Sequence, residues 1–271
     1  MYITQSPDIT KTAEIHQFQL LRQAGNKGRW RLSQKLTRTT RALCLKGIQS
    51  RTITPQRIKN LFALAILNQR IPDILLAGNE MTWIQDSGSL AERLHPLFEQ
   101  ADIPYYVTGG VASTIHGEPR ATRDLDLVIQ VTAAKLDSLV TLLESHGFYV
   151  PPQAVEDMKQ GRNSTLNIVH QETIESADLI LSPDTPFDRA QLERRQKPSA
   201  IGFYLCSAED AVLQKLRWRK HTRSEKQWND VLGIIKMQRE TLDFDYLSDW
   251  ASQLGVADEL KRAVEAATDE E

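Results

Sequence analysis

Cysteine is almost absent from this sequence of 271 residues. Only Cys44 and Cys206 occur, far apart and outside any Cys-x-x-Cys spacing. A disulfide framework or a cysteine-based zinc site is therefore not expected, and a reducing compartment suits the chain. Long apolar runs are also lacking, since none approaches the roughly 20 residues that a membrane helix needs. Residues Met1–Thr10 lack the basic start and apolar stretch of a signal peptide. We therefore expect a cytoplasmic protein with no membrane partner.

Acidic residues are missing from one long stretch of the chain. Between Ile15 and Pro72 there is no Asp or Glu, although the net charge of the whole chain is only −2. The stretch carries these basic residues: Arg22, Lys27, Arg29, Arg31, Lys35, Arg38, Arg41, Lys46, Arg51, Arg57, Lys59 and Arg70. Uncompensated like charges repel one another. Nucleic acid such as RNA, an acidic partner protein or the acidic remainder of the chain could each supply the counter-charge, and a solvated helix face is the remaining interpretation. Aromatic residues are few in this stretch, so stacking on single strands is not indicated.

Apolar periodicity predicts helices in about the first 75 residues. Thr54 followed by Pro55 is typical of a helix start. Gly25 and Gly47 are suited to end the two helices that precede it. The helices expected here are Ala13–Ala24, Ser33–Gly47 and Pro55–Gln69.

Beyond this region the pattern changes. Residues 76–88 are rich in Gly, Asn, Asp and Ser and are expected to form a linker. Ser89, with Glu92 three residues later, predicts a helix that begins with a capping box. Short apolar runs predict strands at Tyr105–Val107, Leu125–Val131, Thr165–Val169, Ala177–Leu181 and Gly202–Leu205. Further helices are expected at Gly110–His116, Ala133–Ser145, Phe187–Arg195, Ala208–Arg219, Gln227–Gln238, Tyr246–Leu254 and Val256–Ala267.

The order of these elements predicts the fold class. Strands and helices alternate first, and helices alone close the chain, which is typical of an α+β fold with a mixed sheet. A helical N-terminal region precedes this core and a C-terminal helical bundle follows it. The units expected are a basic helical region at 1–75, the linker at 76–88, the core at 89–206 and the C-terminal helical subdomain at 207–271.

Two glycines and two aspartates form the most informative motif of the chain. Gly109 and Gly110 follow one predicted strand and precede a predicted helix, where glycines allow close approach to a ligand and free N–H groups suit a phosphate. Asp124 and Asp126 alternate at the start of the next apolar strand, so both carboxylates face one side. Two such carboxylates repel each other unless a cation lies between them, and hard oxygen ligands suit Mg²⁺. Either pair alone is common in turns and at strand ends, whereas the combination indicates a functional site.

This pattern resembles the core motif of the DNA polymerase β-like nucleotidyltransferases. Within that superfamily, the run Arg120-Ala-Thr-Arg-Asp-Leu-Asp126 is similar to the group of AbiEii/AbiGii-type toxins of toxin–antitoxin and phage-defence systems. The resemblance extends from about Ile103 to about Leu254. It implies an enzyme with a mixed-sheet nucleotidyltransferase core that binds an NTP and Mg²⁺ or Mn²⁺. Such an enzyme transfers a nucleoside monophosphate to a hydroxyl of RNA, for example tRNA, or of a protein.

The resemblance also assigns roles to individual residues. Asp124 and Asp126 match the paired metal ligands. Asp178 matches a third carboxylate, which helps to bind the catalytic metal and activates the attacking hydroxyl. Gly109 and Gly110 match the loop that holds the triphosphate. Many relatives have Ser after the first glycine, whereas Gly110 offers only its backbone N–H.

Two later positions match the family as well. Lys215 matches a lysine that contacts phosphate, and Asp230 matches a later aspartate of the catalytic set. Together with Arg123, Lys215 would offset charge that develops on pyrophosphate. Outside the resemblance, Lys215 also fits a solvated helix lysine, and Asp230 fits a helix cap or an ion pair. Trp218 is expected to pack between helices and not to stack on a base.

The chemistry implied is an in-line displacement. Two metal ions held by the three aspartates would neutralise the triphosphate and lower the pKa of the acceptor hydroxyl. The acceptor stays open between tRNA, another RNA and a protein, and a cognate antitoxin or toxin is an expected partner. One competing hypothesis is a non-catalytic nucleic-acid or partner-binding module that retains the fold, which the intact aspartates oppose. Another is an antitoxin-like enzyme that nucleotidylates a partner protein.

Overall fold

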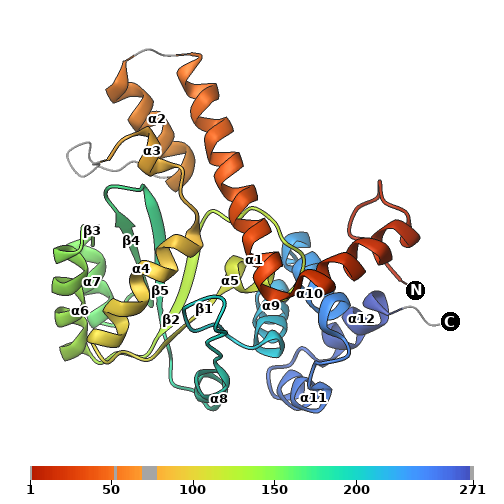
Figure 1. Cartoon of the computed structure of the whole chain (residues 1–271). Helices are drawn as coiled ribbons and strands as arrows, with labels where there is room; N and C mark the ends of the chain where they lie inside the picture. The colour runs from red at the N-terminus through yellow and green to blue at the C-terminus, as the bar shows by residue number, and fades with distance from the viewer. Residues whose placement is uncertain (1, 52–53, 69–77, 269–271) are drawn as a thin grey trace.

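The computed structural model of the chain describes residues 2–51, 54–68 and 78–268. Its fold is α+β, as predicted, with a mixed sheet, helices against one face of the sheet, further helices beside it and a long helical N-terminal arm (Figure 1). The strands are β1 (Tyr105–Thr108), β2 (Leu125–Ile129), β3 (Phe148–Tyr149), β4 (Thr165–His170) and β5 (Glu175–Leu181). The helices before the last strand are α1 (Lys11–Gln49), α2 (Pro55–Leu67), α3 (Glu80–Trp83), α4 (Ser87–Gln100), α5 (Gly109–His116), α6 (Ala133–Ser145) and α7 (Pro152–Lys159). The helices after it are α8 (Pro186–Arg194), α9 (Ala208–Thr222), α10 (Glu225–Gln238), α11 (Phe244–Gln253) and α12 (Ala257–Ala267).

The sheet has one covered face and one open face. Its strand order is β1-β2-β5-β4-β3, with β2 and β5 parallel and the other neighbours antiparallel. Along β2, Leu125 and Leu127 are fully buried in the main core together with side chains of α4 and α6, whereas Asp126 and Val128 are half-exposed. Helices α4 and α6 lie on one side of the strands, so the alternate residues of β2 and β5 face away from them (Figure 1). We call this second side the open face.

The helix boundary predicted at Gly25 is a kink within α1, where two helical parts meet. The backbone of Gly25 has φ 64° and ψ 179°, which kinks the helix there. The prediction that Gly47 ends the helix is wrong, since α1 continues to Gln49. Trp30 packs into the main core against Gly88, where an added Cβ would lie 1.7 Å from the indole ring. The N-terminal helix is thus anchored to the α4 region.

Several basic residues of the acid-free stretch are held within the protein. Arg29 donates to the carbonyl of Ile115 and Arg41 to that of Trp83, and both guanidinium groups are buried. Arg38 pairs with Asp86 at 2.6 Å. The counter-charge anticipated for this region therefore comes in part from the chain itself.

Some predicted boundaries are corrected by the structure. The expected strand at Gly202–Leu205 is wrong: only Leu205 forms isolated bridges, to Val107 and Gln196, and its neighbours fill the main core instead. The helix expected to be capped by Ser89 is instead capped by Asp86, whose carboxylate accepts from the backbone N–H groups of Gly88 and Ser89. Strand β3 and helix α7 were not foreseen. The last residue of the helix expected to end at Gln69 lies outside the described residues.

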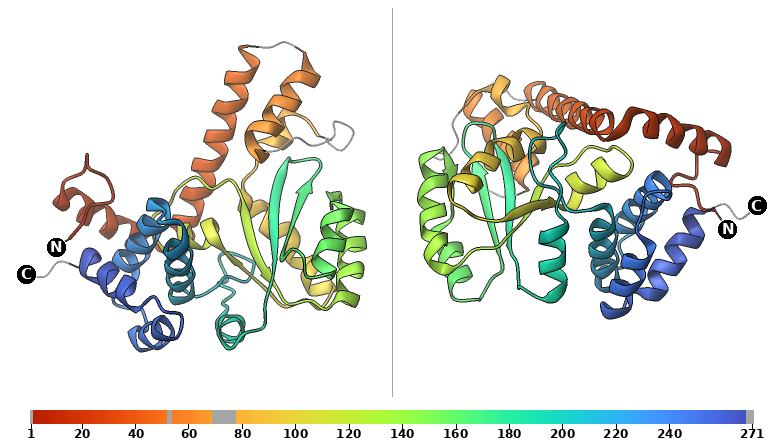
Figure 2. Two further views of the ribbon diagram at one scale, coloured as in Figure 1. Left: turned by 180° about the vertical axis from the view of Figure 1, so that it is seen from behind. Right: turned by 60° about the horizontal axis from the view of Figure 1, so that its bottom comes forward.

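The C-terminal helices pack beside the sheet and meet the start of the chain. Helix α10 packs on α9, α12 and α5. The backbone of Ile3 donates to the carbonyl of Ala266, and buried Glu14 pairs with buried Lys236 at 2.7 Å. The two ends of the described chain therefore lie close together (Figure 2). Within residues 2–51, 54–68 and 78–268, no helix combines the length and apolarity needed to cross a bilayer.

Candidate functional site

Most of the predicted site residues line one cavity of about 200 Å³. It lies where β1, β2 and β5 carry their polar residues and where α9 approaches the open face. Its walls include Gly109, Gly110, Asp124, Asp126, Asp178 and Lys215. Asp230 lies directly behind Lys215, and Arg123 is an exposed partner of Asp124 at 3.2 Å. The structure thus brings together residues that are far apart in the sequence, such as Thr108 and Gln214, which are hydrogen-bonded although 106 positions separate them.

The glycine loop lies directly against Asp126. Gly109 has φ 60°, and a Cβ at this position would lie 1.8 Å from Oδ2 of Asp126. At Gly110 a Cβ would lie 2.6 Å from the hydroxyl oxygen of Thr122. The backbone N–H of Gly110 donates to the Asp126 carboxylate. No other residue type fits either position without displacing a neighbour, so the loop and the carboxylate form one unit.

The three aspartates come together through strand pairing. Asp126 and Asp178 are direct partners in the parallel pair of β2 and β5, and Asp124 precedes them on the same face of β2. Burial raises the pKa of Asp126, and the negative charge of Asp178 raises it further, while Gly110 and Lys215 act in the opposite direction. Asn167 donates to Oδ1 of Asp178 at 2.7 Å.

This carboxylate set has the chemistry of a divalent-metal site. A buried carboxylate with a like-charged neighbour is relieved by a cation, and oxygen ligands suit Mg²⁺ or Mn²⁺. In the described part of the chain, however, no three His, Cys, Asp or Glu side chains are already grouped as a metal site. Asp124 is the member that is turned toward another partner, because Arg123 donates to its carboxylate. Metal coordination by all three would therefore replace this exposed ion pair.

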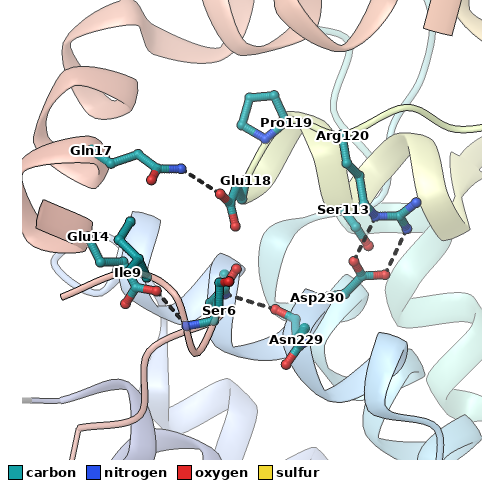
Figure 3. A pocket seen from close by; sticks show the side chains of 12 residues that line it. Ser6, Ile9, Glu14, Gln17, Ser113, Glu118, Pro119, Arg120, Asn229 and Asp230 are labelled. Carbon is teal, nitrogen blue, oxygen red and sulfur yellow. Dashed lines mark hydrogen bonds and ion pairs between the residues drawn. The ribbon is translucent and has the colours of Figure 1, made fainter. Parts of the chain in front are cut away.

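Cations also line this cavity. Lys215 pairs with Oδ2 of Asp230 at 2.7 Å, and Arg120 binds the same carboxylate through two hydrogen bonds of 3.0 Å (Figure 3). Burial by itself would raise the pKa of Asp230, but Lys215 and Arg120 together lower it. Burial lowers the pKa of Lys226, and the positive charge of Arg120 adds to this effect. Lys226 is a third cation in this lining, and the negative charge of Asp230 acts on it as well.

Arg120 was not assigned a role from the sequence. Its Nη2 would lie 3.6 Å from a Cβ at Gly110, so the guanidinium group stands over the glycine loop. It also borders a second pocket of about 340 Å³ that includes Glu118 and Asn229 (Figure 3). The only sequence signal was its place in the run before Asp124, which by itself does not distinguish a site residue from a loop arginine.

The expectation for Trp218 is wrong. The side chain is 58% exposed and lines the cavity, whereas it was expected to pack between helices. On α9 the core positions are taken by Val212, Leu213 and Leu216, all fully buried. Trp218 instead lies on the side of α9 that lines the cavity, together with Lys215 three residues before it.

The likeness to known proteins lies in the fold. No protein-family model matches the chain, and no curated protein matches its sequence. The fold is similar to that of a nucleotidyltransferase-like protein. That protein, an antigenic nucleotidyltransferase-like protein from Paracoccidioides brasiliensis, is 20% identical with a TM-score of 0.45, over 68% of this chain and 94% of its own. A tRNA-processing enzyme in an apo form is 13% identical with a TM-score of 0.31, over 68% of this chain and 59% of its own. Likenesses at these values say nothing of substrates.

Proposed function

We propose that the chain is a metal-dependent nucleotidyltransferase that transfers a nucleoside monophosphate from an NTP to a hydroxyl group. The observation that carries the proposal is the polarity of the cavity. Carboxylates of Asp124, Asp126 and Asp178 line the cavity together with the glycine loop and the cations Lys215 and Arg120. A triphosphate with a divalent cation has the complementary distribution of charge.

Each group has a role in such a reaction. Asp124, Asp126 and Asp178 would hold Mg²⁺ or Mn²⁺, which supplies charge neutralisation and activation of the acceptor hydroxyl. Lys215 and Arg120 are placed to bind the terminal phosphates and to stabilise the charge that develops on the leaving pyrophosphate. Asp230 holds these two cations in position, so that they do not form ion pairs with the three proposed metal-binding carboxylates. Arg123, exposed beside Asp124, is free to move from that carboxylate to a phosphate because exposed ion pairs are weak.

The finer assignment belongs to the same proposal. The AbiEii/AbiGii toxin-like group remains the subgroup that the motif favours, with a cognate toxin or antitoxin protein as partner and the cytoplasm as the location. RNA, such as the end of a tRNA, is the proposed acceptor. What supports it is that Lys27, Arg31, Lys35 and Lys46 of α1 stay exposed after the internal arginines have found partners. A protein acceptor, which an antitoxin-like enzyme would use, is the alternative outcome of the test below.

The decisive experiment is a transfer assay. Purified protein with Mg²⁺ and each α-labelled NTP is offered RNA and, separately, protein acceptors, and label is followed on gels. The wild type should transfer label, EDTA should stop it, and Asp126→Asn should reduce the rate by at least about a thousandfold, because a metal ligand is lost. Asp137→Asn, which changes an exposed carboxylate of α6, is the control and should leave the rate unchanged. A wild type that neither transfers label nor binds NTP would instead indicate a non-catalytic binding module.

The role of the basic residues needs a separate measurement. Replacing Lys27, Lys35 and Lys46 by Gln should weaken RNA binding and reduce the slope of its dependence on salt by up to about three. The rate with a saturating acceptor should not change. An unchanged salt slope would remove RNA from the proposal and leave the protein acceptor.

A further inference from the structure

Another cavity, distinct from the pocket of Figure 3, opens directly beside the catalytic one on the open face of the sheet, and we call it the Trp218 cavity. It has a volume of about 300 Å³ and shares Thr108, Ile180, Gln214 and Trp218 with the cavity that holds the carboxylates. Its remaining walls come from β1, β2, α8 and the segment after β5. The two cavities are therefore neighbours, with Trp218 in the lining of both.

The walls of this cavity suit a flat aromatic ring. Trp218 is the largest side chain there, and its indole is 58% exposed. Val128 and Ile180 line the cavity from the sheet, where both are half-exposed on the open face. Trp218 and Lys215 are neighbours on α9, with Cβ atoms about 5–6 Å apart.

A buried donor without a partner also lies in this wall. Gln191 is 1% exposed, and its Oε1 accepts a hydrogen bond of 3.0 Å from the hydroxyl of Tyr106. Its Nε2 has no hydrogen-bond partner among the described residues. A buried donor left unpaired is costly and uncommon. Gln191 lines the cavity, so an acceptor group that reached this buried amide would supply the missing partner.

We propose that the Trp218 cavity binds a nucleobase, which stacks on Trp218 and accepts a hydrogen bond from Nε2 of Gln191. This inference rests on the proposed function and adds a specificity site to it. The opposite face of the base would lie against Val128 and Ile180. The base belongs either to the donor NTP or to the end of an acceptor RNA, and the same contacts serve both.

The first arm compares ligands with and without a base. Binding of a non-hydrolysable NTP, of ribose 5-triphosphate and of inorganic tripolyphosphate is measured by calorimetry with Mg²⁺. The wild type should bind the NTP about tenfold more tightly than ribose 5-triphosphate, which is the usual contribution of one stacked base. Trp218→Ala should abolish that difference and leave tripolyphosphate binding unchanged, while Trp218→Phe should largely keep it.

Further variants separate stacking and hydrogen bonding from general effects on the fold. Trp218→Leu keeps apolar bulk but removes the aromatic face, and should behave like Trp218→Ala. Gln191→Glu keeps an oxygen for Tyr106 but removes the donor, and should weaken NTP binding severalfold without affecting tripolyphosphate. Leu43→Ala, at a residue 66% exposed on α1, is the remote control and should change nothing. Circular dichroism verifies that each variant is folded.

The second arm identifies the source of the base. If the base comes from the acceptor, NTP and ribose 5-triphosphate bind equally, and Trp218→Ala raises the KM for RNA about tenfold while that for NTP stays constant; this outcome also supports the inference. If transfer proceeds but Trp218→Ala changes neither ligand, the inference is wrong and the proposed function stands. If the wild type binds no tripolyphosphate and transfers nothing, both fall together.

Discussion

At Gly109 the backbone bends so close to Asp126 that a single methyl group would occupy the position of the carboxylate. The residue has φ 60°, a conformation that only glycine adopts at little cost, and a Cβ would stand 1.8 Å from Oδ2 of Asp126. The loop that is proposed to hold phosphate and the carboxylate that is proposed to hold metal are thus positioned by the same residue.

A pair of glycine substitutions tests this coupling. Gly109→Ala should abolish NTP binding, because the methyl group displaces Asp126. Gly161→Ala is the matched control: Gly161 has φ 67° but open space around it, so the change should cost only about 1 kcal/mol in the free energy of unfolding through backbone strain. Activity and the free energy of unfolding are measured for both. Equal losses of activity in the two variants would contradict the assigned role of Gly109.

A buried histidine next to the site makes stability depend on pH. His116 hydrogen-bonds the carbonyl of Cys206 at 2.8 Å, and Gln238 lies 3.2 Å from its other nitrogen, which suits the neutral imidazole. Burial lowers the pKa of His116 to about 4. The folded state therefore resists protonation, while the unfolded chain takes up a proton near its ordinary pKa of about 6.5. Stability from this group is complete above about pH 6.5 and is lost as the pH falls toward 4.

This dependence is measured by comparing two proteins. Between pH 6.5 and about 4, the free energy of unfolding of the wild type should decline more steeply than that of His116→Gln, by up to about 1.4 kcal/mol per pH unit. The glutamine retains a donor for Cys206 but does not titrate. Parallel profiles of the two proteins would mean that His116 is protonated in the folded state as well.

A site residue can be predicted from the sequence when its place in the site is set by neighbouring residues in the chain. It cannot be predicted when its place depends on tertiary packing. Asp124, Asp126 and Gly109 were accessible because strand alternation and glycine chemistry act over a few residues. Trp218 and Gln191 were not, since a helical pattern alone does not tell which face of a helix meets the core. Whether Asp124, Asp126 and Asp178 bind metal stays a prediction.

Among the elements, α1 owes its course to two glycines of opposite effect. Gly25, at φ 64° and ψ 179°, is in a region that is essentially restricted to glycine, and it bends the helix toward α10. Gly47 lies within the helical part of α1, and a Cβ there would meet nothing within 4 Å. The same residue type is thus required at one position and unfavourable at the other.

Substitution by alanine should separate these effects. Gly25→Ala should lower the free energy of unfolding by about 1–3 kcal/mol through backbone strain. Gly47→Ala should raise it by up to about 1 kcal/mol, because glycine is a poor helix former. Denaturant unfolding of both variants provides the measurement. A neutral Gly25→Ala would show that the kink is not fixed by the backbone.

Element prediction succeeded where one short-range period dominated. Strands β1, β2, β4 and β5 were recognised from apolar runs that are buried on at least one face. The run Gly202–Leu205 has the same texture, yet it passes through the core as an extended segment with bridges at Leu205 only. Burial makes such a run apolar whether or not neighbouring strands complete a ladder, so the pattern could not distinguish the two cases.

In the molecule as a whole, the N-terminal region is joined to the core by buried contacts. Trp30 packs into the main core, and Ser33 and Thr37 hydrogen-bond the backbone of Arg120 and Thr122. These last two residues lead directly to the aspartate pair. These contacts join residues before the predicted boundary at residue 75 to residues after it.

Removal of residues 1–75 should therefore unfold the remainder. The shortened chain exposes the surfaces that cover Trp30 and leaves the segment before Asp124 without its partners on α1. We expect loss of cooperative thermal unfolding in circular dichroism and loss of NTP binding. A shortened chain that still unfolds in one sharp transition, within about 5 °C of the full chain, would show that the core is independent of this region.

The position of α1 also has a consequence for the synthesis of the protein on the ribosome. Residues 11–49 emerge before the groups that receive them, which are encoded far downstream: Gly88 for Trp30, Ile115 for Arg29, and Lys236 for Glu14. Until those residues are synthesised, the guanidinium group of Arg29 lacks its carbonyl partner and the indole of Trp30 is exposed to solvent. Helper proteins that shield nascent segments should meet this helix early, and catalysis cannot begin until α10 has left the exit tunnel.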